Sequence, residues 1–162
     1  MSQIESWANI EFNVYIELIN YFTYEFIQQR AKETIQELKS DPYVHHMQLG
    51  QSMLHGLRST VRYYSEHEYY IEAEKLSQEL LNLLQSIPHL GNSLWFFFDI
   101  SFERACNLLR QNKEEGLEIA TDLVKGLDNL KKLSSLQVLT TRREQYFQII
   151  SRLNKTGKPF NP

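Results

Sequence analysis

The chain of 162 residues has the length of one globular domain, with 42% hydrophobic residues, 23% charged residues and a net charge of −3. The slightly acidic balance argues against a nucleic-acid-binding surface as its main purpose. A single cysteine, Cys106, excludes an intramolecular disulfide and suits a reducing cytosol, so we expect a cytoplasmic protein. Residues 1–12 do not have the pattern of a signal peptide and no run of ~18 apolar residues is present, so we expect no membrane partner.

Apolar residues recur at spacings of three and four along the whole chain, which predicts amphipathic helices. The six glycines and four prolines do not cluster as β-hairpin turns would require. Thr23 is a good helix N-cap, and Pro42 and Pro88 follow predicted helix ends. We therefore expect an all-α fold without a sheet, with seven helices at about 4–20, 24–40, 46–66, 69–87, 93–111, 113–130 and 134–153. Short connections predict antiparallel neighbours.

The second, fourth and sixth predicted helices resemble one another in sequence. A shift of 43 residues aligns the fourth with the sixth, and a shift of 46 aligns the second with the fourth. A small residue then recurs at one position, as Ala31, Ser77 and Ala120, where it would let a neighbouring helix approach closely. Self-similarity of this kind predicts an α-solenoid of stacked helix pairs. A seven-helix bundle with accidental similarity is the alternative.

The turn around residues 64–73 resembles the tetratricopeptide repeat. Tyr64, Tyr70 and Ala73 match that repeat's tyrosine, aromatic and alanine positions, although the period here is longer than its roughly 34 residues. The resemblance implies a right-handed solenoid. The helical-repeat domain would span residues 1–153, followed by a polar tail at 154–162 that we expect to fray.

The stretch LWFFFDISFERACNLL, residues 94–109, resembles a membrane segment at first sight, but Asp99, Glu103 and Arg104 exclude that interpretation. Its large apolar side chains cover most of the circumference of a helix, which is typical of a buried helix. The residues that form one stripe and then a second face are Trp95, Phe98, Phe102, Cys106 and Leu109, followed by Phe96, Phe97 and Ile100. We expect Trp95, Phe98 and Phe102 to be core residues more than ligand contacts.

The sequence carries no motif for catalysis, a metal or a cofactor. No two of the five histidines are three or four residues apart, and no glutamate lies three residues before a histidine. There is no phosphate-binding loop and no nucleophile elbow. Cys106 falls on the apolar stripe, where structural cysteines far outnumber catalytic ones. We therefore expect neither an enzyme nor a metal or cofactor site.

Arginines gather on the third, fifth and seventh predicted helices, whereas the fourth and sixth are acidic. In tetratricopeptide-like solenoids the first helix of each pair lines the concave side, so that register predicts an arginine-rich groove. Arginine forks bind carboxylates, and aromatic walls suit a short apolar peptide with an acid on it. The residues expected to bind such a peptide are His55, Arg58, Arg62, Asp99, Phe102 and Arg110. The alternative is that these arginines form ordinary surface or interhelical ion pairs.

The whole chain resembles the C-terminal domain of the Rgg/MutR (GadR) family of Gram-positive transcriptional regulators. The resemblance lies in IESWANIEFNVYIELINYF at residues 4–22, in YYSEHEYYIEA at 63–73 and in the segment from Leu94 to Leu130. It implies a tetratricopeptide-like effector domain that binds a short peptide pheromone and forms a homodimer. We expect dimer contacts from the terminal helices, at Tyr146, Phe147, Ile150 and Leu153.

The family's helix-turn-helix has no counterpart before Trp7, so DNA binding would belong to a parent protein. We expect the chain to be a fragment of a longer regulator, with a natural stand-alone sensor as the alternative. A hypothesis from a different class remains open: a tetratricopeptide-like scaffold that binds a partner protein without a signalling role. A pheromone site should be a closed groove lined by aromatic residues, whereas a scaffold should present an open, flatter one.

Overall fold

The structure is a computed structural model that describes residues 3–40, 48–87, 94–134, 136–160 and 162, and the side chains from residue 10 onward. Two predicted helix ends, at Pro42 and Pro88, lie outside these ranges. The histidines at positions 45, 46 and 89 also lie outside them. The chain divides into two compact units, residues 1–97 and 98–162.

The described residues fold into helices and contain no strand, which confirms the predicted all-α class. None of these helices has both the length and the apolar character needed to cross a membrane. The elements are α1 (Gln3–Leu18), η1 (Ile19–Tyr21), α2 (Tyr24–Ser40), α3 (Gln48–Glu66), α4 (Tyr70–Ser86), α5 (Leu94–Arg110), α6 (Glu115–Leu133) and α7 (Gln137–Leu153).

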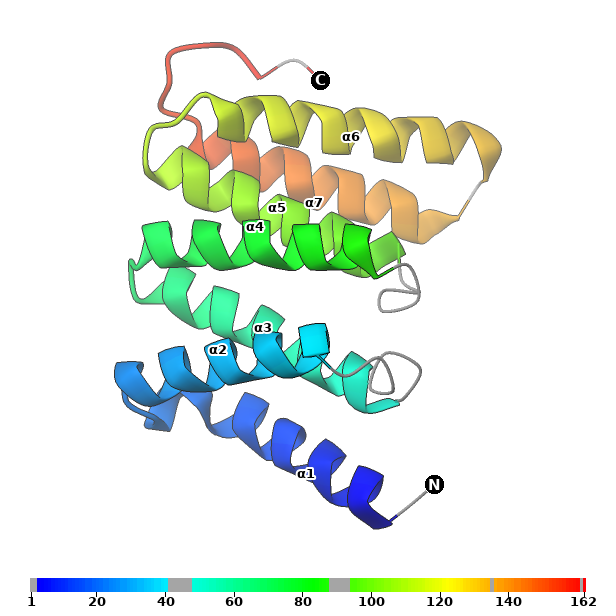
Figure 1. The fold of residues 1–162 in the computed structure, drawn as a ribbon. Coiled ribbons are helices and arrows are strands. Elements are labelled where there is room, and N and C mark those ends of the chain that lie inside the picture. The colour runs from blue at the N-terminus through cyan, green and yellow to red at the C-terminus, as the bar shows by residue number, and fades with distance from the viewer. Residues whose placement is uncertain (1–2, 41–47, 88–93, 135, 161) are drawn as a thin grey trace. The chain divides into compact units, whose positions relative to one another are not determined.

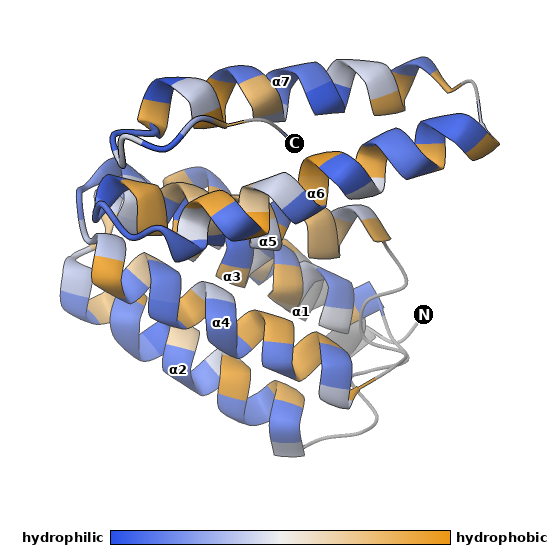
Figure 2. Ribbon diagram, turned by 90° about the horizontal axis from the view of Figure 1, so that it is seen from above, coloured by the Kyte–Doolittle hydropathy of each residue, from blue (hydrophilic) through white to orange (hydrophobic). Residues whose placement is uncertain are grey.

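The first unit is a two-layered array of antiparallel helices. Helices α1 and α3 form one layer, and α2 and α4 form the other (Figures 1 and 2). Helix α3 packs against α1, α2 and α4. Thr23 caps α2 as predicted, because its hydroxyl oxygen accepts a hydrogen bond from the amide of Phe26 at 3.3 Å. A buried hydrogen bond of 2.8 Å joins the hydroxyl groups of Tyr15 and Thr60 across the contact between α1 and α3.

The second unit consists of α5 from Phe98 onward, α6, α7 and the C-terminal segment. Most of α5 is buried, as its sequence predicted, including Phe98, Phe102 and Cys106. Two aromatic residues in the preceding turn depart from that pattern: Trp95 is only half-buried, and Phe97 is 39% exposed. The small residues of the predicted repeat, Ala31, Ser77 and Ala120, are all buried in their respective units.

The same helix reversal occurs after α3 and after α5. Glu68 and Asn112 adopt left-handed backbone conformations, with φ of 65° and 58°, just beyond the ends of these helices. The amide of Tyr69 donates to the carbonyl of Tyr64 at 2.8 Å, and the amide of Lys113 donates to that of Leu108 at 2.9 Å. Both bonds close the helix end by the same six-residue turn, so the connection from α3 to α4 has the same local backbone structure as the connection from α5 to α6.

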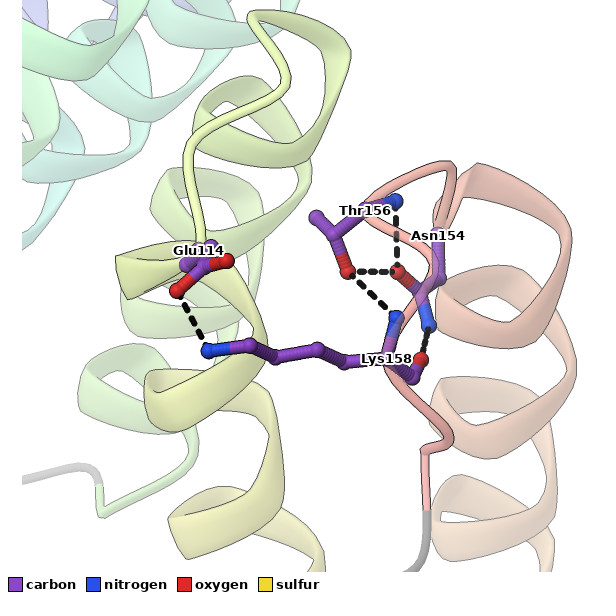
Figure 3. Close-up of polar contacts among 4 residues, drawn as sticks. All are labelled: Glu114, Asn154, Thr156 and Lys158. Atoms are coloured by element: carbon purple, nitrogen blue, oxygen red, sulfur yellow. Dashed lines mark hydrogen bonds and ion pairs between the residues drawn. The ribbon is translucent and has the colours of Figure 1, made fainter.

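The C-terminal segment, which we expected to fray, folds back onto the second unit. Asn154 accepts hydrogen bonds from Thr156 and donates one to the carbonyl of Lys158 at 2.7 Å (Figure 3). The ammonium of Lys158 then forms an ion pair of 2.6 Å with Glu114 at the start of α6. Phe160 is buried and stacks on Phe147 of α7 with 5.3 Å between ring centroids. A local turn and one apolar anchor therefore order the segment.

We predict that Gly116→Ala destabilises the second unit. A Cβ at this position would lie 2.7 Å from the carbonyl oxygen of Ala105 and 2.9 Å from Cγ of Leu109, so α5 and α6 must separate. Such overpacking costs about 1–3 kcal/mol, which urea denaturation measures. Gly126→Ala in the same helix is the control, because its Cβ would lie 3.5 Å from Cζ of Phe98, an ordinary contact, and alanine gains about 1 kcal/mol of helix propensity. Equal stabilities for the two variants would contradict the close approach.

Candidate functional site

The predicted peptide-binding residues His55, Arg58 and Arg62 follow one another along α3 in the first unit. His55 is exposed, and its ring makes an edge-on contact with the ring of Phe96, with 5.8 Å between centroids. Arg58 is half-buried and Arg62 is exposed. Arg62 lines a small hollow of about 150 Å³ that also includes Ile16, Asn20 and Glu66 among its residues. This hollow would hold only a single side chain or a small ion.

Asp99 and Phe102, which were predicted to contact the same peptide, meet α7 within the second unit. The carboxylate of Asp99 forms an ion pair with Arg142 and accepts a hydrogen bond of 3.1 Å from the hydroxyl of Tyr146. The ring of Phe102 stacks on that of Tyr146 at 3.8 Å, with an angle of 3° between the rings. Both residues therefore make interhelical contacts. The sixth predicted residue, Arg110, is exposed and donates to the side-chain oxygen of Asn107 at 3.2 Å.

The hydroxyl of Tyr146 remains a hydrogen-bond donor over the physiological pH range. Burial raises its pKa, and the nearby negative charge of Asp99 raises it further. The neutral hydroxyl and the guanidinium of Arg142 thus both donate to one carboxylate. This half-buried network joins α5 to α7, and its donors and acceptor are already engaged with one another.

The residues predicted to form a dimer interface are largely used within the chain. Tyr146 and Ile150 are buried, and Leu153 is half-buried. Phe147 stacks on Phe160, and the guanidinium of Arg143 lies 5.5 Å from the centroid of the Phe147 ring. These contacts hold α7 and the C-terminal segment together. A homodimer remains a prediction.

A larger groove lies between α2 and α4 in the first unit, where sequence reasoning did not place a site. Its volume is about 730 Å³, within the range of pockets that hold small ligands or short peptide segments. Ala31, Ile35 and Leu76 contribute apolar surface to its lining. Tyr64 and the exposed Ile71 also line it. The remaining lining residues carry amides or charges: Gln28, Gln29, Lys32, Gln36, Lys39, Glu72, Lys75 and Glu79.

The charges of the groove are only partly neutralised by one another. Lys39 and Glu79 form an ion pair of 2.7 Å between α2 and α4. Lys32 and Lys75 make no ion pair with any residue that the structure describes. The groove thus offers two cations, several amides and an apolar lining, a combination that suits an extended peptide bearing a carboxylate.

One aromatic cluster supports the groove. The ring of Tyr24 lies 5.8 Å from that of Tyr64 and 4.8 Å from that of Tyr69. Burial raises the pKa of Tyr64, and that of Tyr24 is raised for the same reason, so both hydroxyl groups stay neutral. The tyrosine-rich turn noted in the sequence therefore stabilises the packing of α2 against the α3–α4 pair.

Comparison of the chain with protein-family models, with curated proteins and with solved structures finds no match. Among the residues that the structure describes, no three histidine, cysteine or acidic side chains gather in a way that could hold a metal ion.

We predict that Cys106 does not react as a nucleophile in the folded chain. Burial raises the pKa of its thiol to about 12, and the carboxylate of Glu103 adds to the effect, so the reactive thiolate is scarce at neutral pH. Ellman's reagent at pH 8 should label the native chain far more slowly than the urea-unfolded chain. Equal labelling rates would show an accessible thiolate. Because the unfolded thiol ionises near pH 9.0 and the folded thiol does not, stability should fall as pH rises above 9.

We also predict that Phe102 acts in folding rather than in ligand contact. Phe102→Ala removes a buried ring stacked on Tyr146 and should destabilise the chain by about 3–5 kcal/mol. Phe97→Ala is the control, because 39% of this side chain is already exposed and less is lost. Chemical denaturation of both variants gives the comparison. If the Phe102 variant is as stable as the Phe97 variant, the prediction is wrong and a role of Phe102 in ligand contact is favoured.

Proposed function

We propose that the chain is the effector domain of a transcriptional regulator of the Rgg/MutR type, which binds a short peptide and dimerises in the cytoplasm. The groove between α2 and α4 is the observation that carries this proposal. The helical-repeat fold and the family resemblance of the sequence support it.

The groove suits an extended peptide better than the α3 surface does. Apolar side chains of the peptide would pack on the exposed Ile71, while glutamine side chains hydrogen-bond to its backbone. An acidic side chain or the C-terminal carboxylate would bind Lys32 or Lys75. Hydrogen bonds to charged groups contribute roughly 1.5–3 kcal/mol each, enough to set the orientation of a short peptide. The proposed site therefore moves from the arginines of α3 and α5 to the lysines of α2 and α4.

A second candidate is a scaffold that binds a partner protein without a signalling role. The lining of the groove favours this scaffold, because Tyr64 is the one aromatic side chain among the described lining residues, and charged groups line much of the remainder. A pheromone site with aromatic walls would enclose its ligand more completely than this groove does. The two candidates differ in the ligand: a free short peptide or an extended segment of a larger protein.

We predict that reversing the charges of Lys32 and Lys75 weakens peptide binding. Native mass spectrometry of the purified chain would report oligomeric state and any co-purified peptide. The probe is a pool of heptapeptides with one Asp or Glu each, from which those retained by the wild-type chain are selected. The double variant Lys32→Glu, Lys75→Glu should bind these selected peptides at least tenfold more weakly than the wild-type chain in calorimetry, a change of about 1.4 kcal/mol. Lys125→Glu on α6 is the control, since that lysine is also exposed and makes no ion pair in the described part of the chain.

Arg62→Ala tests the site predicted from the sequence in the same titration. If affinity falls with Arg62→Ala and not with the groove variant, the peptide binds the α3 surface instead. If no short peptide is retained and the chain captures only larger proteins through the groove, the scaffold is the better account. Circular dichroism of each variant shows that the helices are intact.

A further inference from the structure

The outer face of α1 exposes a continuous row of large apolar side chains. Ile10, Val14, Leu18 and Tyr21 follow at spacings of four, four and three residues, which places them along one side of the helix and its 3-10 extension. Phe26, at the start of α2, is also exposed, and its ring lies 4.7 Å from that of Phe22 beside Tyr21. These five side chains, here named the α1 face, are between 42% and 85% exposed.

Helix α1 is also apolar on its opposite side. Phe12, Tyr15 and Ile19 are buried, and Phe12 and Tyr15 lie against Gly56 of α3. A helix that is apolar around most of its circumference is normally covered on both sides. Exposed apolar patches of this kind mark interaction sites in soluble proteins.

Helix α7, the last helix of the second unit, lacks such a face. Val138 and Ile149 are exposed there, but they stand among exposed polar residues: Gln137, Thr141, Glu144, Gln145, Gln148, Ser151 and Arg152. Terminal helices of repeat proteins carry a polar outer surface of this kind. The exposed side of α7 is therefore more polar than the α1 face.

The charges around the α1 face define the kind of partner. The first 29 residues contain no lysine or arginine and four acids, Glu5, Glu11, Glu17 and Glu25. Glu11 pairs with Arg30 at 2.5 Å but keeps a largely exposed side chain. Glu17 and Glu25 are exposed and make no ion pair with the described residues. Antiparallel pairing of two α1 helices around Val14 would set Glu17 of one copy opposite Glu11 of the other, and like charges repel.

We propose that the α1 face binds an amphipathic helix that carries lysine or arginine along the edges of its apolar stripe. Apolar side chains at i, i+3, i+4 and i+7 of the partner would pack between Ile10, Val14 and Leu18. Basic residues at its margins would pair with Glu17 and Glu25. The proposal is independent of the groove between α2 and α4, because no residue is shared between the two surfaces.

The test uses two synthetic helical peptides of about 18 residues, long enough to form a helix, with identical leucine positions. The first peptide carries lysine at all the remaining positions, and the second carries glutamate at those positions. Fluorescence anisotropy should show at least tenfold tighter binding of the lysine peptide. Val14→Ser and Glu17→Lys should each weaken that binding about tenfold. Val138→Ser on α7 is the matched control, since Val138 is 47% exposed and Val14 48%, and it should leave binding unchanged.

Three results would overturn the proposal. The lysine peptide could bind Val14→Ser as tightly as the wild-type chain, which would place it elsewhere on this acidic protein. The two peptides could bind equally, which would remove the role of Glu17 and Glu25. Sedimentation could show a dimer that Val14→Ser dissociates, so that a second copy of the chain covers the face. The groove variant Lys32→Glu, Lys75→Glu should bind the lysine peptide normally, which separates this test from that of the proposed function.

Discussion

The reversal of the chain after α3 and after α5 is the constraint on which the helix packing depends. At each reversal a non-glycine residue, Glu68 or Asn112, accepts a left-handed conformation, and one hydrogen bond returns to the carbonyl five residues earlier. The next helix then starts so close to its predecessor that only a small side chain fits where the two first meet. Gly116 fills that role at the start of α6, and the fully buried Ala73 stands at the equivalent place in α4.

Much of the fold could be predicted from the sequence because its determinants are local. The period of apolar residues reports which side of each helix is buried, and a cap such as Thr23 acts within three residues of its own position. The order of the C-terminal segment was missed for the opposite reason. Phe160 is ordered by its stacking on Phe147 and Lys158 by its ion pair with Glu114, 44 residues away, and no local pattern reports those contacts.

The candidate site was harder to predict, because it depends on distances between helices. Asp99 was assigned to a ligand, but its partners Arg142 and Tyr146 lie 43 and 47 residues further along the chain. An acid within a run of apolar residues was the available signal, since a half-buried carboxylate needs donors from a neighbouring helix. The groove between α2 and α4 left no such signal. In the sequence, most of its lining residues have the pattern of the polar sides of two amphipathic helices. The groove arises from the separation between α2 and α4, which that pattern does not report.

The uneven distribution of arginine has a structural explanation in the second unit. Arg104 pairs with Glu115, Arg142 with Asp99 and Arg143 with Asp128, so three arginines of α5 and α7 join neighbouring helices.

These three side chains are between 15% and 28% exposed, and partial burial makes such pairs more rigid than ion pairs in open water. A planar guanidinium suits this fixed role, because its fork holds one geometry. Lys32 and Lys75 of the groove differ from these arginines, because they are exposed and their ammonium groups have no fixed fork. Their flexible stems carry a point charge that can change position. The arginines thus stabilise the helix packing, whereas Lys32 and Lys75 have the mobility that the proposed binding of a peptide carboxylate requires.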